Sequence, residues 1–126
     1  MKILLATDGS ERAQAAIDYV LHFPFPGDSE LHLITVIEKE LYRSKKKAEL
    51  SEEQLELLGQ TKKMLLDEAG DIISAGETQL ADAGWNCNSL IREGHPSREI
   101  VRAAKNLAVD LVVVGSHGLG GIKRFL

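Results

Sequence analysis

Short apolar runs alternate with stretches of helical periodicity, and this alternation limits the possible folds more than any other feature of the chain. Apolar residues recur at spacings of three and four in the intervening stretches, which is typical of helices packed on a core. A strand–helix–strand order of this kind predicts an α/β domain with a mostly parallel sheet and helices on both faces. The expected strands are residues 3–6, 31–37, 86–93 and 111–114, and the expected helical stripes are residues 13–21, 55–83 and 100–108.

The polarity of the expected strands predicts their order in the sheet. The first and fourth strands are purely apolar, as is typical of parallel strands covered on both faces. The third contains Asn86, Asn88, Arg92 and Glu93, which suits an edge position. A doubly wound sheet with strand order 3-2-1-4 satisfies these requirements, and it places the first and fourth strands side by side where the winding reverses.

Two loops are expected to meet at that reversal, where open parallel sheets bind ligands beyond the carboxyl ends of their strands. Thr7–Ser10 follows the first strand, and the glycine-rich segment Gly115–Gly121 follows the fourth. Glycines allow a close approach of the backbone to a phosphate, and successive N–H groups can converge on it. The segment matches neither the Walker A pattern nor G-x-G-x-x-G. It is therefore a candidate ligand loop, with a turn that binds nothing as the alternative.

The fourth strand would be an edge in this order, although Leu111–Val114 is the most apolar strand of the chain. Proteins usually cover an apolar edge, because an exposed one pairs with other chains. We therefore expect a fifth strand from beyond Leu126, or a strand of a partner, to pair with it. The sequence predicts a single domain over residues 1–126 that is incomplete at its C-terminal end.

Composition narrows the classes of partner. The net charge of −4 disfavours general nucleic-acid binding, whereas a small nucleotide held by backbone N–H groups stays compatible with it. The single cysteine, Cys87, allows no disulfide within the chain, and no apolar run approaches the length of a signal-peptide core or a membrane span. We expect a cytoplasmic protein without a membrane partner. The scattered histidines have no metal-site spacing.

Asp8 has two compatible interpretations. Asp and Ser both favour helix N-caps, so Asp8 and Ser10 could share the start of the first helix. Asp8 could also contact a ligand at the crevice. A hydrolytic triad of Ser116, His117 and Asp8 is disfavoured, because adjacent residues seldom point at each other and no nucleophile-elbow sequence surrounds the serine.

The motifs at these turns resemble those of the universal stress protein A family. They are Asp8-Gly9-Ser10 after an apolar first strand, Val113 to Gly118 after an apolar fourth, and Gly94-His95-Pro96 before the third helix. The resemblance runs from Lys2 to Leu126. It implies a doubly wound, adenine nucleotide alpha-hydrolase-like (Rossmann-like) domain, commonly a homodimer, that acts in the response to stress.

One branch of this family binds ATP through a pattern of Gly, two residues, Gly, nine residues, then Gly and Ser or Thr. Gly115 and Gly118 match the first two glycines, and the remainder would fall past Leu126. The resemblance thus implies ATP, with or without Mg²⁺, bound more weakly than by a complete member because phosphate hydrogen bonds are lost. The residues implied at the nucleotide are Ala6 and Asp8 at the adenosine, Val36 at the adenine through its backbone, and Val114, Gly115, His117 and Gly118 over the ribose and phosphates.

The leading hypothesis is therefore an ATP-binding regulator of the stress response. No general base is evident, so any ATP hydrolysis is expected to be slow. One alternative is a dimerising interaction module from the branch of the family that binds no nucleotide. Another is a weak ATP hydrolase or phosphotransferase that uses Asp8.

Overall fold

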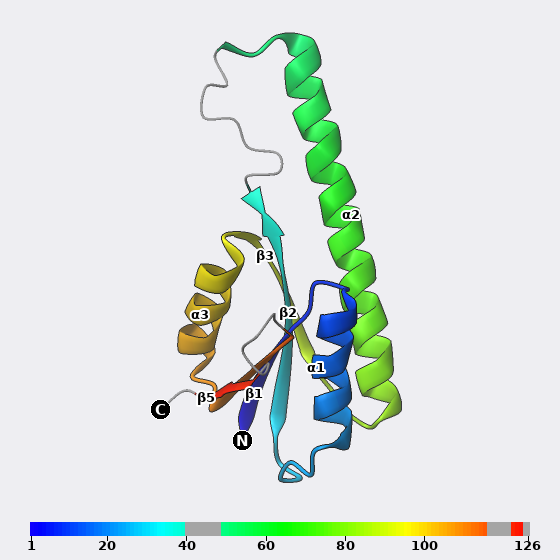
Figure 1. The fold of residues 1–126 in the computed structure, drawn as a ribbon, viewed down its shortest axis with the longest axis vertical. Helices are drawn as coiled ribbons and strands as arrows, with labels where there is room; N and C mark the ends of the chain where they lie inside the picture. The colour runs from blue at the N-terminus through cyan, green and yellow to red at the C-terminus, as the bar shows by residue number, and fades with distance from the viewer. Residues whose placement is uncertain (40–48, 116–121, 125–126) are drawn as a thin grey trace.

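The computed structural model describes residues 1–39, 49–115 and the backbone of residues 122–124. Strands and helices alternate along it as the sequence predicts (Figure 1). Its elements are β1 (Lys2–Ala6), α1 (Glu11–His22), β2 (Glu30–Glu38), α2 (Glu52–Asp82), β3 (Asn88–Gly94), α3 (Pro96–Leu107), β4 (Leu111–Val114) and β5 (Ile122–Arg124).

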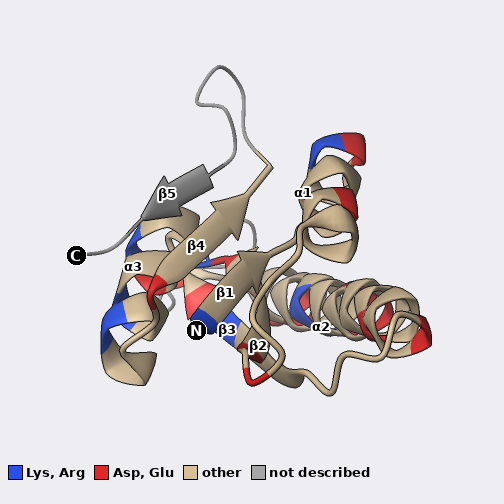
Figure 2. Cartoon of the chain, turned by 90° about the horizontal axis from the view of Figure 1, so that it is seen from below, with Lys and Arg blue, Asp and Glu red and all other residues tan. Residues whose placement is uncertain are grey.

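The strands form one sheet in the order β3-β2-β1-β4-β5. β1 lies between β2 and β4 and is parallel to both, with Ile3 opposite Leu31 on one side and Leu111 on the other. α1 and α2 cover one face of the sheet and α3 covers the other (Figure 2). The predicted α/β class and the 3-2-1-4 order of the parallel strands are confirmed.

The prediction of a bare β4 edge needs a correction. Ile122–Arg124 forms β5, which pairs antiparallel with residues 111–113 of β4, so the chain covers this edge with its own backbone. The sequence predicted the covering strand beyond Leu126 or in a partner. A strand of only 3 residues is too short to show an alternating pattern, which is why it was missed.

Successive residues of the inner strands enter two separate cores, because side chains alternate across a strand. Ile3, Leu5 and Leu33 pack toward α1 and α2, while Leu4 and Ile34 pack toward α3. All five are fully buried. Burial on both faces explains why these strands read as continuous apolar runs.

The long helix α2 begins with a capping box. The Ser51 hydroxyl accepts a hydrogen bond from the Gln54 N–H at 3.1 Å, and the Gln54 side chain accepts one from the Ser51 N–H at 2.9 Å. This capping box satisfies two N–H groups that the first turn would leave open. α2 then extends well past the sheet at its N-terminal end (Figure 1).

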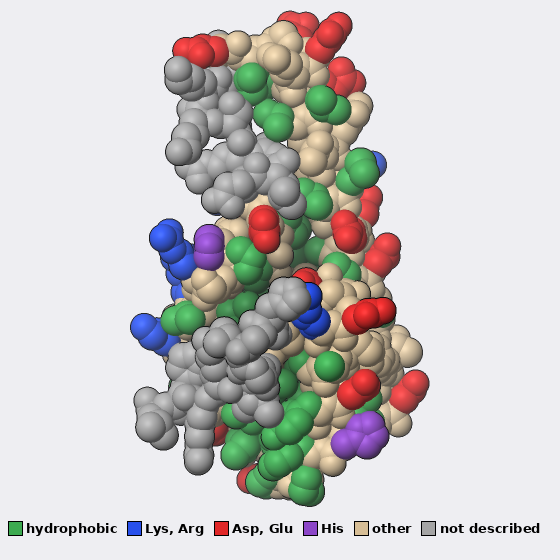
Figure 3. Space-filling view, viewed as in Figure 1, with side chains coloured by type: hydrophobic (Ala, Val, Ile, Leu, Met, Phe, Trp, Pro, Cys, Tyr) green, Lys and Arg blue, Asp and Glu red, His purple; other side chains and the backbone are tan. Residues whose placement is uncertain are grey.

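The protruding part of α2 exposes apolar side chains among acidic ones (Figure 3). Leu57 and Met64 are 63% and 71% exposed, whereas Ala69 and Ile73 further along the helix are buried against the sheet. Among the described residues, no helix combines the length and the apolar character needed to cross a lipid bilayer.

Candidate functional site

The loop after β1 is held tightly between the sheet and α1. The Thr7 N–H donates to the Ile34 carbonyl at 2.9 Å, which continues the sheet one residue beyond β1. The Gly9 N–H then donates to the Thr7 hydroxyl at 3.3 Å, and the Ser10 hydroxyl accepts from the Ala13 N–H at 3.2 Å. Ser10 is thereby the N-cap of α1. The loop therefore has a defined shape at the carboxyl end of the central strand.

Asp8 is exposed at the tip of this loop, and one of its carboxylate oxygens, Oδ1, accepts from the Ser10 N–H at 2.9 Å. The cap is thus Ser10, and Asp8 stabilises the turn before it. A carboxylate has more acceptor positions than one N–H can occupy. Asp8 can therefore shape the loop and accept a hydrogen bond from a ligand at the same time.

Gly9 is required by the shape of the loop. Its φ of +79° is unfavourable for residues with a side chain, and a Cβ there would come within 2.9 Å of Ile72 Cγ1 on α2. The close approach means that α2 supports the loop directly.

A cavity of about 200 Å³ opens beside this loop on the α3 face of the sheet. We call it the α3-side cavity. Its walls are mainly apolar, and the exposed carboxylates of Asp8 and Glu38 add polar groups. Its lining residues are Ala6, Thr7, Asp8, Ile34, Val36, Glu38, Pro96, Ile100 and Val114.

The structure brings part of the predicted site together. Ala6, Asp8, Val36 and Val114, which come from three strands and a loop, line the same cavity. Gly115 does not line it. Ser116, His117 and Gly118 lie outside the described residues, so the phosphate end of the predicted site and the disfavoured triad are not described.

Gly115 has a structural role that the sequence analysis did not identify. A Cβ at this position would overlap the Arg12 carbonyl and approach the Ala13 nitrogen, both in the first turn of α1. These are backbone atoms of a capped helix and cannot easily move. Glycine is therefore needed where β4 passes α1, independently of any ligand.

Glu38, Pro96 and Ile100 line the cavity but were not predicted. Two regularities of the sequence could have identified them. Ile34, Val36 and Glu38 alternate along β2 and must share a face, while Pro96 and Ile100 lie four residues apart on one side of α3.

The lining defines what the cavity can hold. Ile34, Val36 and Ile100 form apolar walls that suit a flat ring, and the two carboxylates can accept hydrogen bonds from hydroxyl and amino groups. An anionic group would be repelled by Asp8 and Glu38, so it would have to lie outside. Among the described residues, no group of three or more His, Cys, Asp and Glu side chains could hold a metal ion.

Comparison with known proteins gives the chain a family. The universal stress protein family profile matches residues 1–126. Universal stress protein MJ0577 of Methanocaldococcus jannaschii is 30% identical over 132 residues, which cover 99% of this chain and 82% of that protein. Universal stress protein YxiE of Bacillus subtilis is 25% identical, with coverage of 99% and 84%.

Solved structures share the fold. The structure of MJ0577 has a TM-score of 0.77 and 32% identity, and the match covers 93% of this chain and 75% of that one. A family protein from Arabidopsis thaliana, solved with AMP bound, has a TM-score of 0.68 and 20% identity over 95% and 79% of the two chains. Sequence profile, relatives and fold agree, and this chain belongs to the universal stress protein family.

Proposed function

We propose that this chain binds an adenine nucleotide, with the nucleoside in the α3-side cavity, and acts as an ATP-responsive regulator of the stress response. The observation that carries the proposal is the mainly apolar cavity at the strand-order reversal, lined by Ala6, Asp8, Val36 and Val114. Such a crevice is the usual ligand site of an open parallel sheet. Family proteins have been solved with AMP bound and in complex with cAMP, which supports an adenine nucleotide as the ligand.

Each part of the nucleoside has a matching group in the cavity. The adenine ring would lie between the apolar side chains of Val36 and Ile100, which removes its faces from water. The ribose hydroxyls would donate to the free acceptor positions of Asp8, as acidic residues do in dinucleotide sites. The repulsion from Asp8 and Glu38 would direct the phosphates out of the cavity.

The proposal is one of binding and not of turnover. The two carboxylates of the lining, Asp8 and Glu38, lie at the nucleoside end of the site, away from the phosphates. We expect ATP hydrolysis, with or without Mg²⁺, to be slow at most. On the family resemblance we further propose that the protein is a cytoplasmic homodimer.

Calorimetric titration with ATP and with AMP tests the proposal. Asp8→Ala removes the acceptor for the ribose, and a hydrogen bond to a charged group contributes about 1.5–3 kcal/mol. We expect the Kd for both nucleotides to rise by about 10- to 100-fold in this variant. Similar losses for ATP and AMP are expected, because Asp8 contacts the part that the two nucleotides share.

Asp67→Ala is the matched control, since it removes one carboxylate from an exposed position of α2 that does not line the cavity. Its affinity should stay within twofold of the wild type. Absence of heat with both nucleotides would contradict the proposal and favour the interaction module. Nucleotide turnover that Asp8→Ala abolishes while binding persists would favour the enzyme instead.

A further inference from the structure

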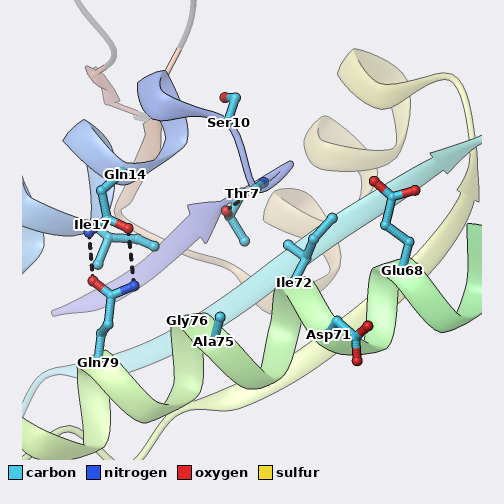
Figure 4. A pocket seen from close by; sticks show the side chains of 11 residues that line it. Thr7, Ser10, Gln14, Ile17, Glu68, Asp71, Ile72, Ala75, Gly76 and Gln79 are labelled. Atoms are coloured by element: carbon cyan, nitrogen blue, oxygen red, sulfur yellow. Dashed lines mark hydrogen bonds between the residues drawn. The ribbon is translucent and has the colours of Figure 1, made fainter.

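We propose that a second cavity, between α1 and α2, binds a linear aliphatic diamine with a long uninterrupted methylene chain. This α1–α2 cavity has a volume of about 260 Å³ and lies on the face of the sheet opposite the α3-side cavity (Figure 4). Thr7 lines both cavities. The remaining lining residues are Gly9, Ser10, Gln14, Ile17, Glu68, Asp71, Ile72, Ala75, Gly76 and Gln79.

The cavity is elongated along α2. Glu68 and Gln79 mark its two ends on this helix, and the lining positions between them recur every three or four residues. A rise of 1.5 Å per residue separates these ends by roughly 16 Å. The small residues Ala75 and Gly76 leave the middle open, so an extended ligand fits better than a compact one.

The middle of the cavity is apolar. Ile17 of α1 is buried and lines it, and Ile72 of α2 lines it between Gly76 and Glu68 (Figure 4). Neither side chain offers a hydrogen bond. A chain of methylene groups would gain from burial here, whereas a polar or branched sugar-like ligand would lose hydrogen bonds to water.

One end of the cavity carries an unpaired negative charge. Glu68 and Ile72 extend from the same side of α2 (Figure 4). Asp71 also lines the cavity, but its carboxylate is turned away from these two side chains. No salt bridge to Glu68 occurs in the part of the chain that the structure describes. The carboxylate is therefore available to an ammonium group at the end of a ligand.

The other end offers oxygen acceptors around an amide pair. Gln14 Nε2 donates to Gln79 Oε1 at 2.6 Å, and Gln79 Nε2 donates to Gln14 Oε1 at 3.0 Å (Figure 4). Gln14 Nε2 also donates to Asp18 Oδ1 at 3.1 Å, which uses both of its hydrogens. Each amide oxygen keeps a second acceptor position, and Asp18 adds a carboxylate nearby. An ammonium group, which has three donors and no acceptor, matches this end as well.

The charge of α2 excludes anionic ligands from this cavity. Glu52–Asp82 contains eight acidic residues and two basic ones, and 2 − 8 gives −6 for the helix alone. Basic side chains gather instead on the α3 side (Figure 3). A field of this sign raises the local concentration of cations and lowers that of phosphates. Length, apolar middle and acceptors at both ends together specify a chain-like amine.

Calorimetric titration with 1,8-diaminooctane and with 1,4-diaminobutane tests this inference on the whole chain. We expect saturable binding of 1,8-diaminooctane and weaker binding of 1,4-diaminobutane, because the shorter chain cannot reach both ends at once. The Kd for 1,8-diaminooctane should rise on the order of tenfold in Glu68→Gln, which keeps the shape of the side chain and removes its charge. The control is Asp67→Asn, which neutralises the adjacent exposed carboxylate outside the cavity. It should stay within twofold of the wild type.

Several results would overturn the inference. Equal losses in Glu68→Gln and Asp67→Asn would mean that 1,8-diaminooctane is attracted by charge in general. Equal binding of 1,8-octanediol, a neutral chain, would show that the cavity does not select cations. Titration without saturation would exclude a site. Because the two cavities lie on opposite faces, failure here leaves nucleotide binding by the α3-side cavity untouched.

Discussion

The α3-side cavity and the α1–α2 cavity both adjoin the loop after β1, yet different elements line them. Strand residues such as Ala6, Ile34 and Val36 form most of the first, whereas α2 side chains form most of the second. The alternation of side chains across β1 and β2 produces a core on each face and a cavity at the end of each core. The sheet thus places a cavity beside the same loop on each of its faces, while the elements that cover the face give each lining its charge and shape.

The largest expected effect is a loss of stability on substitution of Gly115, which lies between the end of β4 and the first turn of α1. Gly115→Ala places a Cβ onto the Arg12 carbonyl, and neither backbone can easily move. We expect it to lower the free energy of unfolding by about 3 kcal/mol or more, at the upper end of overpacking costs. Urea denaturation measures this change.

Gly9→Ala is the informative comparison for Gly115. Its Cβ would meet Ile72 Cγ1, an atom of a side chain and not of the backbone, so we expect the positive φ to be the larger cost, about 1–2 kcal/mol. Gly27→Ala, where a Cβ meets no atom within 4 Å, serves as the control. A Gly115→Ala variant as stable as Gly27→Ala would show that β4 does not approach α1 this closely.

Filling one cavity at a time tests whether the two are independent. Val36→Phe enlarges a half-buried residue that lines the α3-side cavity, and Ala75→Phe enlarges an exposed residue that lines the α1–α2 cavity. We expect Val36→Phe to weaken AMP binding by more than about tenfold with little change for 1,8-diaminooctane, because a bulky ring takes the place of ligand. The converse is expected for Ala75→Phe. Loss of both ligands in either variant would refute the separation.

The glycines of α2 distinguish its free part from its packed part. A Cβ at Gly59 or Gly70 would meet no atom within 4 Å, so Gly→Ala there should stabilise the protein by up to ~1 kcal/mol through helix propensity. At Gly76 a Cβ would lie 3.0 Å from Leu33 Cδ2, and the gain should shrink or reverse. The melting temperatures of the three variants, measured by thermal unfolding, give the order of their stabilities.

The smallest expected effect lies at the end of α3, away from both cavities. Ala108 caps this helix with φ at +53°, a conformation that glycine adopts at lower cost. Ala108→Gly should raise the free energy of unfolding by up to ~1 kcal/mol and leave both ligand affinities unchanged. A fall in stability would show that the methyl group contributes more through packing than the backbone conformation costs.

Sequence patterns predicted the fold well because burial leaves a strong trace. Continuous apolar character marked β1 and β4 as strands covered on both faces, and polar residues marked β3 as an edge. β5 could not be predicted from the sequence pattern. It has only 3 residues, and its pairing with β4 is visible only in the folded structure.

The candidate site was predictable only where it follows a strand end. Ala6, Asp8, Val36 and Val114 line one cavity, although their contact with a nucleotide stays a prediction. Gly115 was assigned to a ligand, whereas its contact with α1 is a steric requirement that no local motif reveals. The α1–α2 cavity was not predicted at all, because its lining joins helix faces more than fifty residues apart in the sequence.

The most direct test of the account is an amide NMR titration of the isotope-labelled chain with AMP, followed residue by residue. The account predicts that the largest saturable shifts occur at Ala6, Asp8, Val36 and Ile100, on the α3 side of the sheet. Shifts centred on Gln14 and Gln79 instead, or none that saturate, would contradict it.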